Sequence, residues 1–306
     1  MKALRIHDYE KPLQMEEAPK PAAGPGQVLV ENHFTSMNGV DPGRAGGFLR
    51  QVFQLEFPWI PGGDVAGQVV AVGNGVTGFK IGDEVFGYTR TGGAYAEFTL
   101  VDATSLAHRP AKIPAEQAAA IALVGQTATQ MLELSKVTKG KTLLIMGAAG
   151  GVGSLAVQLA RRAGVHVIAT AKKSQETALK AFGADQVVDY TRQPLDGIEQ
   201  VDGVLNLVGG DTVASSYARV KRGGVAVTSN RPPDGAEAAR LGIEAAFVQA
   251  DVKTEGLNTF AKLVTDGEIK PQIAAVETLW APATLWRDRE TDKLGKVVFF
   301  LSTPTE

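Results

Sequence analysis

The sequence predicts an α/β protein with two units: a β-rich unit and a unit built on a parallel sheet that helices cover on both faces. Residues 1–109 contain short strand-like segments separated by Gly- and Pro-rich turns, whereas residues 113–270 alternate apolar strands with amphipathic helices. The end of the chain returns to the first pattern. We therefore predict that residues 114–271 form a domain inserted into a first domain, which comprises residues 1–113 and 272–306.

The strands of the first domain are short and are bounded by turn residues such as those of "AAGPGQ" and "VGNGVTGFKIGD". This spacing is typical of a barrel-like unit. The expected strands are 1–8, 26–34, 66–73, 83–88, 94–101 and, at the end of the chain, 296–301.

The strands of the second domain are almost wholly apolar, which is typical of a parallel sheet buried on both faces. The expected strands are 141–147, 165–171, 186–190, 201–209 and 225–230. Three intervening segments show helical periodicity. The expected helices are 151–164, 174–184 and 211–224.

The composition excludes several classes of partner and site. The 306 residues are 44% hydrophobic and carry a net charge of −2, so neither nucleic acid nor an anionic membrane is expected as a partner. The absence of Cys excludes disulfides, thiolate metal sites and a catalytic thiol. No apolar run approaches the ~20 residues of a membrane helix, and the first twelve residues meet charge and proline too early for a signal peptide. We expect a cytoplasmic protein.

A Gly-rich turn, "GAAGGVG" at residues 147–153, connects the first strand of the second domain to its first helix. Gly150 and Gly151 allow the backbone to approach a pyrophosphate closely, and Gly153 allows the helix to pack near the strand. The helix N-terminus, including Val152, then presents N–H groups to the phosphates. Ala148 replaces the first glycine of the usual pattern, but the strand–turn–helix context still predicts a dinucleotide site.

The residues after the second strand of this domain favour NADPH over NADH. An NAD site places an acidic residue there to accept from the ribose hydroxyls. This chain has Thr170 and Ala171 instead, followed by Lys172 and Lys173, which would attract a 2′-phosphate. The alternative is that the two lysines simply begin a solvated helix.

Several motifs occur in the order of one known family. They are "NGVD" (38–41), 61–87, "GGAYAEF" (92–98), "GQTATQ" (125–130), "GAAGGVG" (147–153), "FGADQVVDY" (182–190), "VDGVLNLVGGDT" (201–212) and "GKVVF" (295–299). Together they resemble the quinone oxidoreductase branch of the medium-chain dehydrogenase/reductase superfamily over nearly the full length. The resemblance implies a GroES-like catalytic domain, a Rossmann domain that binds NADPH, and an active site in the cleft between them.

The resemblance also implies that no metal is needed. "SMNGVD" stands where the zinc-dependent branch carries its first cysteine ligand, and the chain's four histidines are dispersed. Without a Lewis acid, oxidation of a simple alcohol is difficult. Hydride transfer to a quinone or an α,β-unsaturated carbonyl is easier, because the conjugated system spreads the charge and hydrogen-bond donors suffice for the oxyanion.

Site residues carry over from the family position by position. Asn38 resembles the residue whose amide lies beside the nicotinamide ribose and the substrate, although it could equally serve a local turn. Thr127 matches a threonine near the nicotinamide, although its hydroxyl could instead bond back to its own helix. Further cofactor contacts are expected along the strand ends. They are Thr170, Lys172, Lys173 and Tyr190 near the 2′-phosphate, and Asn230, Phe247, Val248 and Lys296 toward the nicotinamide side.

The substrate contacts are less well defined, because the "RAGGF" loop departs from the family pattern. Phe48 stands where relatives often have a tyrosine; it could stack on a flat substrate but cannot donate a proton. The proton would then come from water or from a hydroxyl such as that of Tyr88.

These residues predict a zinc-independent, NADPH-dependent oxidoreductase acting on a quinone or an α,β-unsaturated carbonyl. Two alternatives stay open: a 2-enoyl thioester reductase, and a non-catalytic NADPH-binding protein acting as a sensor or structural component. An apolar segment at residues 245–252 resembles an exposed edge strand, so we expect a homodimer.

Overall fold

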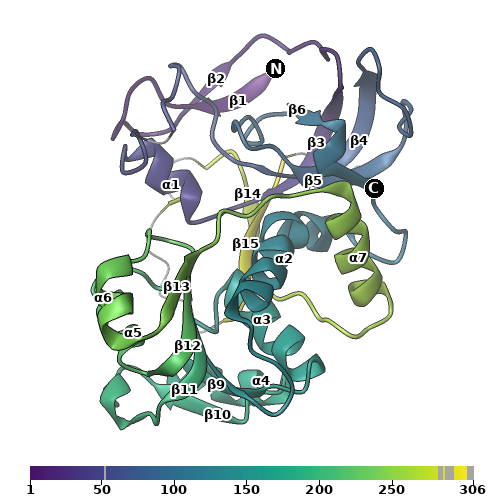
Figure 1. Cartoon of the computed structure of the whole chain (residues 1–306). Helices are drawn as coiled ribbons and strands as arrows, with labels where there is room; N and C mark the ends of the chain where they lie inside the picture. The colour runs from purple at the N-terminus through teal and green to yellow at the C-terminus, as the bar shows by residue number, and fades with distance from the viewer. Residues whose placement is uncertain (52, 282–284, 287–292, 302–306) are drawn as a thin grey trace.

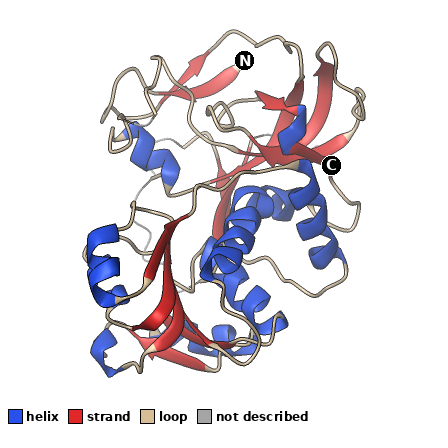
Figure 2. Ribbon diagram, viewed as in Figure 1, coloured by secondary structure: helices blue, strands red, loops and turns tan. Residues whose placement is uncertain are grey.

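A computed structural model describes residues 1–51, 53–281, 285–286 and 293–301, and it confirms the α/β fold (Figure 1). Most strands from the two ends of the chain gather in one sheet, and the strands from the middle of the chain form a second sheet flanked by helices (Figure 2). The boundaries predicted for the two domains remain a prediction. None of the helices described is long and apolar enough to cross a membrane.

The β-rich part contains a seven-stranded sheet in the order β14-β15-β3-β4-β5-β7, with β6 also paired to β3. Its strands are β3 (Gln27–Ser36), β4 (Asp64–Val72), β5 (Glu84–Tyr88), β6 (Phe98–Asp102), β7 (Leu106–His108), β14 (Ile273–Thr278) and β15 (Lys296–Phe300). A separate hairpin pairs β1 (Lys2–Arg5) with β2 (Gln14–Glu17). Strand β15 runs antiparallel to β3, with Val298 opposite Ser36, so the end of the chain joins the N-terminal strands.

The second sheet has six parallel strands in the order β10-β9-β8-β11-β12-β13. They are β8 (Thr142–Met146), β9 (His166–Ala171), β10 (Gln186–Asp189), β11 (Val201–Asn206), β12 (Val220–Thr228) and β13 (Glu244–Phe247). This is the strand order of a Rossmann fold. The order reverses between β8 and β11, so ligands are expected beyond the carboxyl ends of these two strands.

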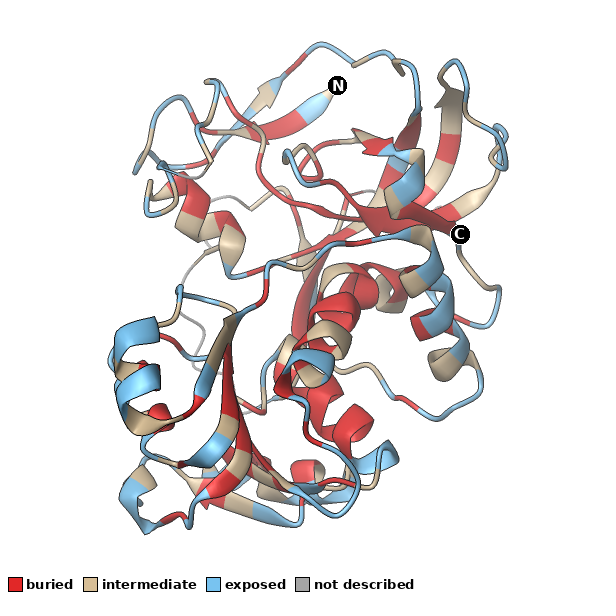
Figure 3. Ribbon diagram, viewed as in Figure 1, coloured by how far each residue is buried: buried red, intermediate tan, exposed pale blue. Residues whose placement is uncertain are grey.

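Seven α-helices are described, along with three short 3₁₀ turns. The helices are α1 (Val40–Ala45), α2 (Ala115–Ser135), α3 (Gly151–Arg162), α4 (Glu176–Ala181), α5 (Thr212–Tyr217), α6 (Gly235–Leu241) and α7 (Thr254–Thr265), and the turns are η1 (Ala103–Ser105), η2 (Lys173–Gln175) and η3 (Leu195–Gly197). Helix α2 is largely buried because it packs against both sheets and against α3 and α7 (Figure 3).

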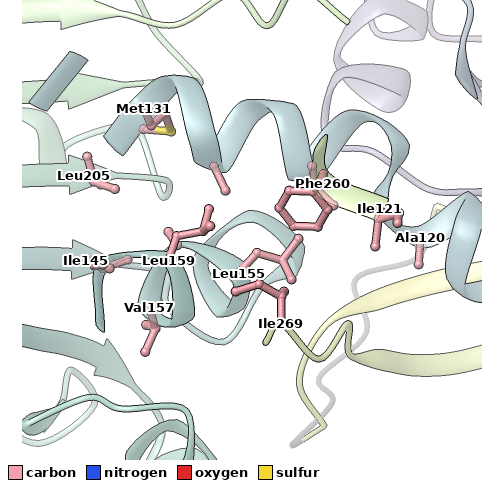
Figure 4. Close-up of a cluster of buried hydrophobic side chains, with 14 of the residues drawn as sticks. Ala120, Ile121, Met131, Ile145, Leu155, Val157, Leu159, Leu205, Phe260 and Ile269 are labelled. Atoms are coloured by element: carbon pink, nitrogen blue, oxygen red, sulfur yellow. The ribbon is translucent and has the colours of Figure 1, made fainter. Parts of the chain in front are cut away.

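The core beside α2 depends on a close approach to α7. The ring of Phe260 lies among side chains of α2 and α3 (Figure 4). A Cβ at Gly125 would lie only 2.9 Å from that ring, so glycine is needed for the two helices to come this close. The core thereby holds α2 rigidly between the two sheets, and α2 carries Thr127.

The bounds of several predicted elements differ from the structure, and two of these differences bear on the fold and the predicted interface. The helix predicted over 211–224 ends at Tyr217, because strand β12 already begins at Val220, where Arg219 O accepts a hydrogen bond from Val201 N. Residues from Val220 onward, which helical periodicity assigned to the helix, therefore form a strand paired with β11. The strand predicted over 245–252 is β13, which ends at Phe247.

Candidate cofactor and active site

The carboxyl ends of β8 and β11 form the crevice where the strand order reverses. Strand β8 ends at Met146, and Gly147 follows with a φ of 76°, a conformation that L side chains rarely adopt. A Cβ there would lie 3.3 Å from both Leu207 and Val208, the residues that follow β11. The Gly-rich turn therefore passes close to the loop after the neighbouring strand.

The turn leaves the space that a pyrophosphate would need. Gly150 is the N-cap of α3, and a Cβ on it would meet only Gly147 O, at 3.5 Å. At Gly153, in contrast, a Cβ would lie 2.3 Å from Gly147 O, so this glycine serves close packing of the helix on the turn. The helical hydrogen bonds begin at Ser154 N, which leaves the N–H groups of the first turn available to a ligand. The cradle fits a dinucleotide phosphate.

The end of the chain crosses this turn. Gly295 N donates to Ala149 O at 2.9 Å, and Gly150 and Gly295 form an isolated parallel bridge. A Cβ at Gly151 would lie 2.6 Å from Cδ and 2.8 Å from Cγ of Lys296. The stem of Lys296 therefore lies directly against the start of α3, and only glycine fits beneath it.

The ammonium group of Lys296 reaches the first domain. Its Nζ donates to Asn38 Oδ1 at 2.5 Å and to Met37 O at 2.5 Å, and it lies 3.3 Å from Asp64 Oδ2. Lys296 is 5% exposed and Asp64 is fully buried. A single side chain thus connects the Gly-rich turn to Asn38.

Asp64 organises the other side of Asn38. Its Oδ2 accepts from Asn38 Nδ2 at 2.7 Å and from Ser36 Oγ at 2.5 Å, and its Oδ1 accepts from Leu123 N at 2.9 Å. The Asn38 amide is therefore held at its oxygen by Lys296 and at its nitrogen by Asp64. We call Asn38, Asp64 and Lys296 the buried cluster.

Burial dominates the electrostatics around this cluster. Desolvation lowers the pKa of Lys296, while the Asp64 carboxylate acts in the opposite direction. Desolvation also raises the pKa of Asp41 to about 6, although the N–H of Asn38 donates to that carboxylate at 2.8 Å. The pKa of Tyr88 is raised by burial as well, so its hydroxyl keeps its proton.

Three predicted catalytic or substrate residues occupy distinct environments. Thr127 is buried and donates its hydroxyl to Leu123 O at 2.9 Å, so its proton is used within α2 while its oxygen can still accept. Tyr88 is buried and lies opposite Asp64 in the β4–β5 pairing. Phe48 is 86% exposed and sits in the loop after α1. Their roles remain predictions.

Of the four residues predicted near the 2′-phosphate, Lys173 lines a small pocket beside β10, whereas Thr170, Lys172 and Tyr190 are not among its lining residues. The side chains that line this pocket are Lys173, Glu176, Val187, Asp189, Arg192 and Gln193. Thr170 is buried and accepts from Gly147 N at 3.3 Å, so it holds the Gly-rich turn. Lys172 donates its backbone N–H to Gln175 Oε1 at 3.0 Å, and Tyr190 is 55% exposed.

Exposed apolar side chains mark the same edge of the parallel sheet. Three large ones lie at or just beyond carboxyl ends of strands: Tyr190 after β10, Val208 after β11 and Phe247 at the end of β13. Asn230 donates Nδ2 to Leu207 O at 2.5 Å, and Val248 is buried. Exposed rings and a methyl-bearing side chain along one strand edge are suited to the flat faces of a dinucleotide.

Sequence reasoning missed three polar residues of this region. Asp64 follows "PGG" at the first position of β4, and an acid beginning an otherwise apolar strand was the available signal. Asn206 ends β11 and accepts from the N–H groups of Val208 and Gly209, both at 3.0 Å. Glu176 and its pairing with Lys173 were also missed, although the i, i+3 spacing of the two residues was the available signal.

Histidine and carboxylate side chains do not gather into a metal site in the part of the chain that the structure describes. The positive charge in the buried cluster comes from Lys296.

Family models match both parts of the chain. The alcohol dehydrogenase GroES-like domain matches residues 24–111, and the zinc-binding dehydrogenase domain matches residues 151–254. Among curated relatives, the chloroplastic NADPH-dependent alkenal/one oxidoreductase of Arabidopsis thaliana is 34% identical over 222 residues, which is 68% of this chain and 57% of the relative. The matched stretches cover only 54% to 61% of the first curated relatives.

Solved structures match over almost the whole chain. The quinone oxidoreductase from Coxiella burnetii is 30% identical with a TM-score of 0.90, and the match covers 99% of both chains. The Escherichia coli quinone oxidoreductase complexed with NADPH is 25% identical with a TM-score of 0.85, covering 98% of this chain and 100% of that one. With its GroES-like and Rossmann parts in this order, the chain belongs to the quinone oxidoreductase branch of the medium-chain dehydrogenase/reductase superfamily.

Proposed function

We propose that this protein is an NADPH-dependent oxidoreductase that transfers hydride to a quinone or an α,β-unsaturated carbonyl without zinc. The observation that carries the proposal is the contact of Lys296 with both Gly151 and Asn38. It places the predicted phosphate turn and the predicted catalytic amide at opposite ends of one buried side chain. Relatives named quinone oxidoreductase and alkenal/one oxidoreductase support the substrate class.

A bound nicotinamide dinucleotide would supply the hydride, and the chain's own residues would bind and orient it. The N–H groups at the start of α3 would hold the pyrophosphate, and Gly150 would leave room for it. Lys173, beyond β9, would attract the 2′-phosphate of NADPH. The name of the Arabidopsis relative and the NADPH complex of the E. coli enzyme support this cofactor.

Asn38 and Tyr88 would serve the reacting end. The oxygen of the Asn38 amide accepts from Lys296, so the Nδ2 group faces Asp64 with one of its two hydrogens and can offer the other to an oxygen of the substrate or ribose. Tyr88 stays protonated, because burial raises its pKa, and it can therefore donate to a developing oxyanion. Thr127 can accept a hydrogen bond at the same end.

The positive charge of Lys296 supports the proposal that the enzyme works without zinc. The ammonium of Lys296 lies 3.3 Å from Asp64 Oδ2 and bonds to Asn38. A divalent cation at these oxygens would meet a fixed positive charge at hydrogen-bond distance. The chain also lacks the cysteine thiolates that zinc prefers.

The edge strand β13 supports a homodimer. It has a neighbour, β12, on one side in the sheet order, and Phe247 at its end is 40% exposed. Light scattering would give about twice the chain mass of 32.2 kDa for a dimer, whereas a value near that mass would reject it. The cytoplasmic location stays a prediction that cell fractionation would test.

The function is tested by following NADPH and NADH oxidation with benzoquinone, naphthoquinone, short enones and 2-enoyl thioesters. We expect turnover with NADPH and a quinone or enone. Turnover restricted to enoyl thioesters would favour the thioester reductase, and NADPH binding without turnover on the whole panel would favour the sensor. Absence of NADPH binding at micromolar concentrations would contradict the proposal.

A further inference from the structure

We propose that Glu176 weakens the preference for NADPH over NADH, because its carboxylate pairs with Lys173, the lysine that would bind the ribose 2′-phosphate. This inference rests on the NADPH specificity proposed above. It assigns a role to a residue that competes with the cofactor rather than holding it.

The Glu176 side chain lines the pocket in which the 2′-phosphate is expected. Glu176 begins α4 and lines the same pocket as Lys173, which follows β9, together with Val187 and Asp189 of β10. Its Oε2 pairs with Lys173 Nζ, and its Oε1 lies 2.7 Å from Lys180 Nζ. The Glu176 side chain is 20% exposed, whereas the Lys173 side chain is 69% exposed. The carboxylate is therefore held in place while the lysine is free to move toward a ligand.

The pocket lining holds a second carboxylate, Asp189, and a second cation, Arg192. Asp189 accepts from Thr191 N at 3.0 Å and from Thr191 Oγ1 at 2.6 Å, and its pKa is lowered. Its other oxygen lies 3.7 Å from Arg192 Nε. The lining of the pocket thus contains two carboxylates, Glu176 and Asp189, and two cations, Lys173 and Arg192, while Lys180 pairs with Glu176 from outside the lining.

A 2′-phosphate brings a charge of about −1.5 to −2 and three acceptor oxygens. An ammonium has three donors, so Lys173 can bond to the phosphate while it still pairs with Glu176, and the two anions then lie close together and repel each other. The hydrogen bonds from Lys173 and Lys180 lower the pKa of Glu176 to about 2, so the carboxylate stays charged throughout the physiological range. NADH lacks the 2′-phosphate, so this repulsion does not affect its binding affinity.

The test compares Glu176→Gln with wild type by fluorescence titration of NADPH and of NADH. Glutamine keeps the size and one acceptor oxygen but removes the charge. We expect NADPH to bind about fivefold more tightly and NADH to change less than about twofold. Raising the salt from ~0.05 to ~0.3 M should shrink the NADPH gain, because the charges are exposed.

A matched control is Glu268→Gln. Glu268 pairs with Arg162 at the last residue of α3, the end opposite the phosphate turn, so this variant removes the same charge far from the pocket. It should leave both affinities unchanged. A second readout uses adenosine 2′,5′-bisphosphate and adenosine 5′-monophosphate as probes, since they differ only in the 2′-phosphate. Glu176→Gln should tighten the bisphosphate alone.

Three outcomes would overturn the inference while leaving the proposed function intact: unchanged NADPH affinity in Glu176→Gln, equal tightening of NADPH and NADH, or weaker NADPH binding. The last would mean that Glu176 orients Lys173 for the phosphate. Failure of the wild type to bind either dinucleotide would instead contradict the proposed function itself.

Discussion

Two charged regions of this molecule hold their charges in opposite ways. In the buried cluster, Lys296 and Asp64 are 5% and 0% exposed, and hydrogen bonds use both oxygens of Asp64. In the pocket beyond β9, the Lys173 side chain is 69% exposed and its partner Glu176 is shared with another lysine. The buried charges are fixed by folding, whereas the exposed ones can exchange partners with a ligand.

This difference implies that the buried charges serve folding and orientation, whereas the exposed charges serve the choice of cofactor. A buried ion pair contributes to stability only while both partners are present, because removing one leaves an uncompensated charge away from water. An exposed pair contributes little to stability and responds to salt. We therefore expect mutations in the buried cluster to affect folding and orientation, and mutations in the pocket to affect cofactor choice.

The largest expected effect follows from Lys296→Met. This variant keeps the aliphatic stem on Gly151 but leaves the Asp64 carboxylate buried without its cation. The free energy of unfolding should fall by about 3–5 kcal/mol, measured by urea denaturation. The double variant Lys296→Met/Asp64→Asn removes both charges and should recover a large part of that loss. A single variant as stable as wild type would show that the pair is not a unit.

The second expected effect is a pH dependence caused by Asp41. Its pKa of about 6 in the folded chain exceeds the ordinary value of 3.8, so the folded state binds the proton more tightly. Stability from this group is therefore fully present below about pH 4 and is lost as the pH rises through 6. Relative to Asp41→Asn, wild type should lose about 2–3 kcal/mol between pH 4 and 7. Parallel stability curves for the two proteins would contradict this.

A smaller effect distinguishes two adjacent glycines of the phosphate turn. Gly151→Ala should destabilise the fold by about 1–3 kcal/mol, because its Cβ would overlap the stem of Lys296. Gly150→Ala meets only Gly147 O at 3.5 Å, so it should fold normally yet weaken NADPH binding by filling the space for the pyrophosphate. Thermal melts and NADPH titrations measure both properties. Equal stability of the two variants would contradict the contact between the Lys296 stem and Gly151.

The smallest expected effect is on cofactor affinity at the exposed pocket. Lys173→Gln should weaken NADPH binding about tenfold and leave NADH binding and the melting temperature unchanged, because it removes one exposed charge that faces the 2′-phosphate. Lys139→Gln is the control, since Lys139 is exposed and precedes β8, at the amino end of the strand rather than the carboxyl end. If NADPH and NADH lost affinity equally, the 2′-phosphate would not lie at Lys173.

The sequence allowed prediction of the features that depend on neighbouring residues. The Gly-rich turn is recognisable because a strand, four glycines and an amphipathic helix follow one another within residues 143–164. The same local signals identified the parallel strands. They overextended α5, because helical periodicity in residues 211–224 cannot reveal that Val220 pairs with the distant β11.

The buried cluster could not be assembled from the sequence in this way. The contact of Lys296 with the cofactor stays a prediction. Its ammonium bonds to Asn38 and Asp64, which lie more than two hundred positions away in the sequence and come near through the β15–β3 pairing. In the pocket, the sequence shows Thr170 and Ala171 where an NAD site has an acid, and the preference for NADPH inferred from them stays a prediction. However, the fold brings Glu176 and Asp189 to the same pocket from two other elements.

The most direct test of the whole account is a crystal structure of the protein soaked with NADPH. We expect the pyrophosphate against the N–H groups of Gly151 and Val152, the 2′-phosphate beside Lys173, and the nicotinamide next to Asn38. Density for the dinucleotide at another surface, or for the adenosine end away from Lys173, would contradict it.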